Sequence, residues 1–340
     1  MDNKTVFSGI QPTGELHVGN YFGAVKNWVR LQDLHRCFFC VVDLHSMTMP
    51  YDVPTFQKNT EEMFVSLLSC GLDPKRCTVF VQSMVPEHAE LNWILGCIAS
   101  YGDLTRQIQF KEKSDQLAAT ADDPTAGGFI SAGLFNYPVL QAADILLYHA
   151  AYVPVGKDQE QHLELSRVIA RRFNKQFGQE YFAEPKVLST DLPKLLSLAD
   201  PTKKMSKSLG DKHVVPLFGE EKLIRTRVRS AVTDSGETPE GELSAGVQNL
   251  LAILRSCDKA DTAAEFESQY HSGDRKYSPL KDAVADTLVS LSTGMRARRS
   301  EIAADRGAII KLMHDTADQA RSVASETIKD VRKLTGLPSR

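Results

Sequence analysis

The sequence predicts an α/β fold in which a doubly wound parallel sheet is followed by an all-helical domain, and two observations carry this prediction. In the first half of the chain, short apolar runs alternate with amphipathic segments. Strands that alternate with helices form a parallel sheet covered on both faces, which binds ligands at the carboxyl ends of its strands. After Gly210 the strand patterns fade and helical patterns dominate. We therefore expect a sheet domain over residues 1–209 and a helical domain over residues 210–340.

The predicted strands are short and apolar. Residues 37–42 form a continuous apolar run that ends before Asp43, which is typical of a buried parallel strand. Residues 78–82 are rich in β-branched and aromatic types, which favour strands. We expect further strand segments at residues 6–7 and at residues 153–156, where a turn follows.

The predicted helices carry apolar residues three and four positions apart, which puts those residues on one buried face. In the first domain we expect helices from His17, through residues 63–68, over residues 88–98 and 140–149, and after Asp158. In the second domain we expect them over residues 223–231, 247–254, 263–270, 280–291 and 309–334. The stretch 114–128 is poor in apolar residues and predicts a surface loop.

Composition indicates an ordinary globular protein in a reducing compartment. Of the 340 residues 42% are hydrophobic, and the net charge of −3 means that local basic patches would have to hold any nucleic acid. Cys37 and Cys40 have CxxC spacing, but no second CxxC completes a zinc site, so we expect a buried strand and no metal ligands. Neither a signal peptide nor an apolar run of about 18 residues is present. We expect a cytoplasmic protein that spans no membrane, or an organellar one whose presequence has been removed.

Residues 7–21 have the pattern of a strand end, a tight loop and a helix start. Gly14 breaks regular structure, and Gly19 lets a ligand or another backbone approach the start of the helix. A helix N-terminus offers free N–H groups and partial positive charge, so it suits a phosphate. His17 and Asn20 would then stand beside that phosphate as neutral or cationic donors. Taken alone, the stretch fits a purely structural strand-turn-helix equally well.

A second stretch, residues 203–208, reads Lys-Lys-Met-Ser-Lys-Ser. Its lysines and serines make a poor core and a poor helix but a good mobile cationic loop. The two stretches together resemble the HIGH and KMSKS signatures of the class I aminoacyl-tRNA synthetases. The first reads His-Val-Gly-Asn here, from His17 to Asn20, and is similar to the form in tryptophanyl-tRNA synthetases. The resemblance implies a Rossmann-like core that binds ATP, an amino acid and a tRNA.

Such an enzyme needs no nucleophile of its own, because the carboxylate of the amino acid attacks the α-phosphate of ATP. The protein positions the reactants and neutralises charge on the phosphates, and Mg²⁺ would accompany ATP without protein ligands of its own. The resemblance implies catalytic roles for His17, Asn20, Lys113, Lys204 and Lys207. It implies an ATP site formed by Gln11, His17, Gly19, Asn20, Gly156, Asp158, Gln159, Leu195, Lys204, Met205, Ser206, Lys207 and Ser208.

Two of these assignments have a simpler alternative. Gly156 and Asp158 match the turn that binds the ribose in the family, but Asp158 also suits a helix cap. Lys113 matches a lysine that reaches the phosphates, and a solvated surface lysine explains it almost as well.

Further stretches extend the resemblance to tryptophanyl-tRNA synthetase over nearly the whole chain. They are residues 7–14, 42–45, 137–144, 153–162 and 231–235. Asp144 lies on a mostly apolar helix, where a carboxylate needs a donor, and an indole offers one N–H and no acceptor. A salt bridge or a helix-end contact is the structural alternative for Asp144. The resemblance implies a tryptophan site formed by Phe7, Gly9, Gln11, His45, Tyr137, Gln141, Asp144 and Gln159. Gln141 departs from many relatives, which carry Met at this position.

The expected partners are L-tryptophan, ATP, tRNA(Trp) and a second copy of the chain in a homodimer. Candidate contacts to the tRNA are Arg225, Arg227, Arg229, Arg296, Arg298 and Arg299. Three other functions stay open: a tyrosyl-tRNA synthetase, an adenylyltransferase without a tRNA partner, and an inactive regulatory binder. The alanines before Asp144, the long helical domain and the intact signatures argue against them in that order.

Overall fold

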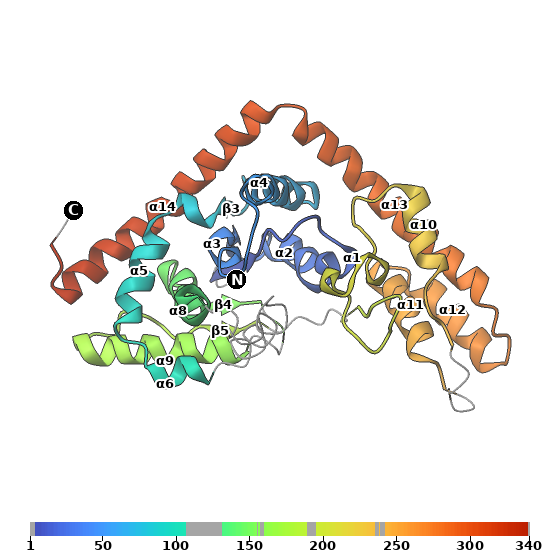
Figure 1. The fold of residues 1–340 in the computed structure, drawn as a ribbon, viewed down its shortest axis with the longest axis horizontal. Helices are drawn as coiled ribbons and strands as arrows, with labels where there is room; N and C mark the ends of the chain where they lie inside the picture. Colours follow the sequence, from blue (N-terminus) through green and yellow to red (C-terminus); the bar gives the residue numbers. More distant parts are fainter. Residues whose placement is uncertain are drawn as a thin grey trace, which may run out of the picture.

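The structure is a computed structural model of the chain, drawn in Figure 1. It describes residues 4–106, 131–154, 156, 160–188, 195–234, 238 and 242–338. The expected loop 114–128 lies outside these residues, as do Lys113, Asp158 and Gln159.

Five parallel strands form the sheet of the described chain, in the order β3-β2-β1-β4-β5. They are Thr5–Ile10 (β1), Arg36–Val41 (β2), Thr78–Val81 (β3), Tyr152–Val153 (β4) and Lys186–Val187 (β5). The order reverses between β1 and β4, and doubly wound sheets bind ligands beyond the carboxyl ends of the strands at such a point. The predicted α/β fold is confirmed. The sequence pattern does not predict β5, because this two-residue strand lies in a segment that reads as a loop.

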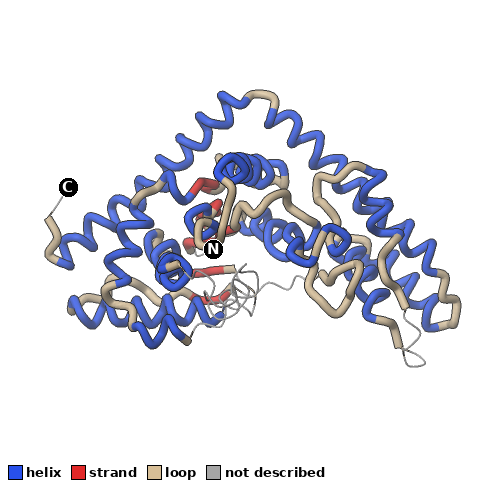
Figure 2. Tube along the Cα trace, in the orientation of Figure 1, coloured by secondary structure: helices blue, strands red, loops and turns tan. Residues whose placement is uncertain are grey.

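The central strands turn alternate side chains toward two apolar layers, as expected of a sheet buried on both faces. Phe39 and Val41 join the layer formed by helix α2 (Lys26–Leu31) and helix α4 (Val53–Ser69). Phe7, Phe38 and Phe80 join the opposite layer. That layer contains helices α5 (Glu87–Gly96), α8 (Ala132–Leu147) and α9 (Glu160–Phe177). Figure 2 shows helices on both sides of the strands.

The predicted helix after the first signature is present but is not uniform. It consists of α1 (Val18–Asn20), a π-helical turn (Tyr21–Val25) and α2. Val18, Phe22 and Val25 are buried, as their spacing predicts. Three short elements come later in the chain: α3 (Asp43–Ser46) follows β2, a 3-10 turn (Gln82–Met84) follows β3, and α6 (Tyr101–Thr105) follows α5.

Helix α8 begins earlier than the sequence predicts, and the predicted start at residue 140 is wrong. The helix starts at Ala132, where the hydroxyl of Ser131 accepts a hydrogen bond of 3.1 Å from the N–H of Leu134. Pro138 therefore lies inside the helix, although a proline has no N–H and usually marks a boundary. Pro138 is fully packed, so burial of this apolar helix offsets the lost hydrogen bond.

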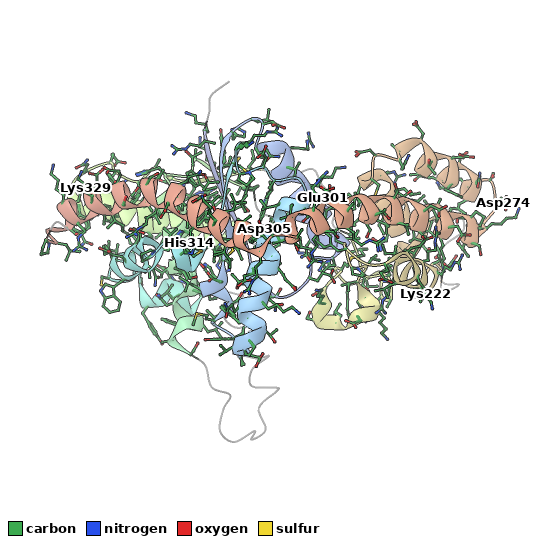
Figure 3. The ribbon with its side chains drawn as sticks, turned by 90° about the horizontal axis from the view of Figure 1, so that it is seen from above. Lys222, Asp274, Glu301, Asp305, His314 and Lys329 are labelled. Carbon is green, nitrogen blue, oxygen red and sulfur yellow. The ribbon has the colours of Figure 1, made fainter. Side chains whose placement is uncertain are left out.

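The region after Gly210 is helical, as predicted. Its helices are α10 (Glu221–Arg229), α11 (Ala245–Ser256), α12 (Ala260–His271), α13 (Tyr277–Ala303) and α14 (Arg306–Thr335). Short 3-10 turns cover Lys207–Leu209 and Asp211–His213. In Figure 1, α13 and α14 form a wide V over the molecule, and Figure 3 shows Glu301 and Asp305 at its apex.

Helix α14 returns from the helical region to the sheet. It packs along β3, α5 and α8, and its buried apolar residues from Ala317 to Val331 belong to the same apolar layer as α5 and α8, whereas Ile309 and Met313 join the opposite layer. The domain division at Gly210 stays a prediction, since the last helix joins both regions. None of the described helices is long and apolar enough to cross a bilayer.

Two helical glycines have opposite surroundings, and we expect opposite effects from replacing them. A Cβ on Gly246 of α11 would lie 2.2 Å from the carbonyl oxygen of Val232, whereas a Cβ on Gly294 of α13 would meet nothing within 4 Å. Gly246→Ala should destabilise the protein by about 1–3 kcal/mol through overpacking. Gly294→Ala should stabilise it by roughly 0.5–1 kcal/mol. Thermal denaturation of both variants checks this, and a Gly246→Ala protein as stable as wild type would contradict it.

Candidate functional site

The first signature segment forms a reciprocal cap at the start of α1. Asn20 N–H donates to His17 Nδ1 at 3.2 Å, and His17 N–H donates to Asn20 Oδ1 at 3.2 Å. Because Nδ1 accepts a hydrogen bond, the proton of the neutral imidazole resides on Nε2, which can act as a donor. Burial, together with the positive charges of Lys207 and Lys204, lowers the pKa of His17 to about 4. His17 therefore acts as a neutral donor at neutral pH.

We expect the imidazole of His17 to stay neutral as the pH falls from 8 to 5. Between the ordinary pKa of 6.5 and the folded value of about 4, the unfolded chain binds more protons at this site than the folded chain. The site's contribution to stability is thus complete above pH 6.5 and is lost as the pH falls toward 4. An NMR titration of the histidine Cε1–H signals, assigned with His17→Asn, checks this. A midpoint near 6.5 would contradict it.

The two signature segments contact each other directly. Met205 is buried, and its Cβ would lie 3.1 Å from a Cβ placed on Gly19. The absence of a side chain at position 19 thus leaves room for Met205. Gly19 has this packing role in addition to the predicted one of letting a ligand approach. The second segment is also tied to its neighbours, since Met205 N–H donates to the carbonyl of Leu195 at 3.1 Å. Leu196 and Lys204 form an antiparallel bridge beside this contact.

A cavity of about 740 Å³ lies between the loop after β1 and the second signature segment. Predicted site residues that line it are Gln11, His17, Asn20, Lys204, Ser206, Lys207 and Ser208. The Nζ atom of Lys207 lies 3.5 Å from the position that a Cβ on Gly14 would take. Burial lowers the pKa of Lys207, and the carboxylates of Glu15 and Asp211 oppose this. A neutral imidazole, hydroxyls and ammonium groups in one cavity suit a polyphosphate.

Other predicted ATP-site residues lie elsewhere or cannot be placed. Gly19, Leu195 and Met205 contact one another but do not line the cavity. Gly156 is exposed, and Lys113, Asp158 and Gln159 are outside the described residues. The site residues predicted from the sequence do not include six that line the cavity, which are Ile10, Thr13, Gly14, Glu15, Leu16 and Met63. Glu15 had a usable signal, because it lies within the first signature stretch.

Asp144 lies at the centre of a second polar cluster, which is buried between α3, α5 and α8. Its Oδ2 accepts from His45 Nε2 at 2.8 Å. Its Oδ1 accepts from Gln82 Nε2 at 2.7 Å and from His88 Nδ1 at 2.6 Å. Burial raises the pKa of the Asp144 carboxyl, but the hydrogen bonds from His45 and His88 outweigh burial and hold the pKa below its ordinary value. Asp144 is therefore an ionised acceptor.

The structure adds three residues to this cluster that the sequence analysis missed: Gln82, His88 and Tyr148. His88 Nε2 lies 2.8 Å from the hydroxyl of Tyr148, so the cluster extends to the end of α8. Gln82 Oε1 is buried without a partner in the described chain, while its amide nitrogen is fixed by Asp144. The signal available for Gln82 was its position at the carboxyl end of β3, where ligand-binding residues gather.

Of the other predicted tryptophan-site residues, Tyr137 and Phe7 contact this cluster, whereas Gln11 lines the cavity of the signature segments and Gln159 lies outside the described residues. Tyr137 is buried, with its hydroxyl 3.2 Å from His162 Nε2 and its ring 6.3 Å from that of His45. Phe7 stacks on Tyr148 at 5.6 Å. Gly9 is exposed, and a Cβ there would lie 2.7 Å from Cγ1 of Val42. Gln141 is half-buried on α8.

Several of the predicted tRNA contacts are engaged within the chain. Arg225 pairs with Glu221 and Asp286, each at 2.7 Å. Arg298 donates to the carbonyl of Ser69. The role of the arginines toward tRNA stays a prediction.

Comparisons with known proteins agree with this geometry. A family model described as tRNA synthetases class I (W and Y) matches residues 2–292. The tryptophan--tRNA ligase of Caldanaerobacter subterraneus subsp. tengcongensis is 41% identical over 98% of both chains. The tryptophanyl-tRNA synthetase structure from Mycoplasma pneumoniae has a TM-score of 0.86 at 32% identity and covers 98% of both chains. The Campylobacter jejuni enzyme, solved with ADP and tryptophan, has a TM-score of 0.82 at 31% identity and covers 98% of this chain and 100% of that one.

The fold, the two adjoining signatures and these matches show that the chain belongs to the class I tRNA synthetases of the W and Y type. Full-length identity of 41% to a tryptophan--tRNA ligase assigns it, within that class, to the tryptophanyl-tRNA synthetase family. The predicted resemblance is confirmed.

Proposed function

We propose that this chain is a tryptophan--tRNA ligase. It activates L-tryptophan with ATP: a carboxylate oxygen attacks the α-phosphorus, the bond to the β-phosphate breaks, and pyrophosphate leaves. A ribose hydroxyl of tRNA(Trp) then attacks the carbonyl of the adenylate, and AMP leaves. The observation that carries the proposal is the cavity shared by the two signature segments, on the same sheet edge as a buried carboxylate that suits an indole.

In this proposal ATP occupies the cavity, and the chain contributes position and charge. His17 Nε2–H and the Asn20 side chain face the phosphates as neutral donors, while Lys204 and Lys207 bind them as cations. The ammonium of Lys207 stabilises the negative charge that develops on the departing pyrophosphate. Ser206 and Ser208, whose hydroxyls are 2.9 Å apart, add neutral donors. Lys113, Asp158 and Gln159 complete the site by their match to the family.

Mg²⁺ fits this site as an ion that the triphosphate brings with it. Glu15 is the one carboxylate among the described residues that line the cavity, and no group of three metal-binding side chains exists in the described part of the chain. Phosphate oxygens and water are ordinary Mg²⁺ ligands, so protein ligands are not required. When bound, Mg²⁺ screens the charge of the phosphates.

Tryptophan selectivity is assigned to Asp144. An ionised carboxylate has about four acceptor positions, and three donors occupy Asp144 here, two at Oδ1 and one at Oδ2. The position left on Oδ2 suits the single N–H of an indole. The cluster of His45, Gln82 and His88 fixes the carboxylate in place before the substrate arrives. Tyr137 and Gln159 are assigned to the α-amino group, and Phe7, Gly9, His45 and Gln141 to the ring pocket.

The proposal includes a homodimer that binds tRNA through the helical region. Trp93 of α5 is 76% exposed and Tyr101 of α6 is 75% exposed, and large exposed aromatic side chains are typical of an interface.

All six cysteines are free thiols, which fits the cytoplasm or an organellar matrix.

Aminoacylation of a tRNA(Trp) transcript with labelled tryptophan tests the proposed function. We expect esterification that depends on ATP and on the tRNA, and none when tyrosine replaces tryptophan. Charging of a tRNA(Tyr) transcript with tyrosine would overturn the tryptophan assignment. Adenylate formation without any transfer to tRNA would overturn the ligase assignment.

A further inference from the structure

Glu15 brings a negative charge into a cavity that otherwise suits anions. It lies between Gly14, whose Cβ position is 3.5 Å from Lys207 Nζ, and Leu16, which lines the same cavity. A carboxylate at this place can repel a triphosphate, and it can also pair with a lysine that the triphosphate needs. The effect of Glu15 on ATP binding therefore depends on which cation its carboxylate contacts.

The side chain that contacts Glu15 is Arg299 of α13, which lies in the helical region, 284 positions further along the chain. Its Nη1 lies 3.3 Å from Glu15 Oε1, and its Nη2 lies 3.9 Å from Glu62 Oε2 of α4. Its guanidinium lies over the ring of Phe218 at 4.8 Å, which fixes the plane of the group. Within the described part of the chain, Glu15 pairs with Arg299 and not with Lys207.

Backbone hydrogen bonds connect the loop that carries Glu15 to the segment that carries Phe218. Val18 N–H donates to the carbonyl of Val215, and Leu217 N–H donates to the carbonyl of Leu16, both at 2.9 Å. The segment that delivers Phe218 is therefore bonded to the loop that carries Glu15. Arg299 is 25% exposed, so the solvent screens its charge only in part.

We propose that Arg299 is a positioning residue for the ATP site: it holds the Glu15 carboxylate and so leaves the ammonium of Lys207 free to bind the phosphates. The inference rests on the proposed function, because it requires ATP in the cavity. Arg299 itself does not line the cavity and acts through Glu15. The pKa of Lys207 already responds to the charge of Glu15, which agrees with their closeness. Arg299 was a candidate tRNA contact, and its three neighbours within the chain favour this other role.

The test is ATP–pyrophosphate exchange by the full-length Arg299→Gln variant, with ATP and tryptophan varied separately. We expect the KM for ATP to rise about threefold to fivefold, as for a partly exposed ion pair, and the KM for tryptophan to stay unchanged. The double variant Arg299→Gln with Glu15→Gln has no carboxylate at position 15 that could pair with Lys207. Its KM for ATP should therefore return to within about twofold of wild type. Arg306→Gln is the matched control, because Arg306 joins α14 to Glu61 of α4 but does not contact Glu15.

An unchanged KM for ATP in Arg299→Gln would overturn the proposal, and so would a double variant as impaired as the single one. If Arg299→Gln does not fold, Glu15→Gln alone decides. Because Arg299 already holds the carboxylate, a KM for ATP within about twofold of wild type supports the proposal. A larger change overturns it, and a lowered KM would mean that Glu15 competes for Lys207 even in the presence of Arg299. Lys207→Ala in the same assay distinguishes a failure of the proposed ATP site from a failure of the role of Arg299 alone. Wild-type exchange in Lys207→Ala would refute the ATP site itself, whereas impaired exchange there with a normal Arg299→Gln refutes only the role of Arg299.

Discussion

Lys207→Ala is expected to slow formation of tryptophanyl-adenylate by about 10²–10³-fold, the usual effect of removing a preorganised group that stabilises charge in a transition state. Lys207 lines the cavity, is partly buried, and approaches the loop after β1 at Gly14. Its ammonium therefore meets the phosphates in surroundings where a charge is poorly screened. The effect should fall on the rate of the step, measured by single-turnover adenylate formation. Tryptophan affinity should stay within about twofold of wild type, since the Asp144 cluster makes no described contact with Lys207.

Lys203→Ala is the matched control for that prediction. Lys203 belongs to the same segment, but it pairs with Asp200 at 3.3 Å and does not line the cavity. Its loss should change the rate by less than about threefold, because exposed pairs contribute little. Equal losses in Lys203→Ala and Lys207→Ala would mean that the segment acts only through its net charge. A wild-type rate in Lys207→Ala would refute its assigned role.

Asp144→Ala is expected to weaken tryptophan binding by at least about 10²-fold while the affinity for ATP changes much less. The substitution removes the acceptor assigned to the indole and leaves three buried donors, on His45, Gln82 and His88, without a partner. Breaking a buried charged cluster in this way also costs about 3–5 kcal/mol of stability. Equilibrium binding of tryptophan and of ATP, each measured on the folded variant below its melting temperature, separates the two effects. An equal loss of both affinities would contradict the indole role.

Tyr148→Phe is a useful control for the cluster. It removes the hydroxyl that His88 contacts at 2.8 Å and leaves every donor of Asp144 in place. Tryptophan affinity should fall by no more than about threefold, because one neutral hydrogen bond at the far end of the cluster is lost. A loss as large as that of Asp144→Ala would show that the cluster, and not the carboxylate, sets the affinity.

The sequence predicts those features whose signals are local. The apolar run at residues 37–42 predicts β2, and the helical spacing of Val18, Phe22 and Val25 predicts a buried face. The two signature stretches predict a shared cavity, although they are about 190 positions apart, because the resemblance to a family supplies the distant contact. The π-helical turn within the first helix and the early start of α8 at Ala132 have no comparable signal. Burial of Pro138 depends on tertiary packing that local spacing does not encode.

The partners of Asp144 and of Glu15 could not be predicted for a related reason. His88 and Gln82 read as members of an amphipathic helix and of a strand end, and only the fold brings both to the carboxylate on α8. Arg299 has the pattern of one of several basic residues on a helix, and its contact with Glu15 depends on how α13 packs against α4. Isolated polar residues carry no information about distant partners.

The most direct test of the central claim is ATP–pyrophosphate exchange with each of the twenty amino acids in turn. We expect exchange with tryptophan and with no other amino acid, because only an indole offers one donor and no acceptor to the open position on Asp144 Oδ2. Exchange with tyrosine would keep the cavity and its lysines but contradict the assignment of Asp144. An absence of exchange with every amino acid would contradict the account as a whole.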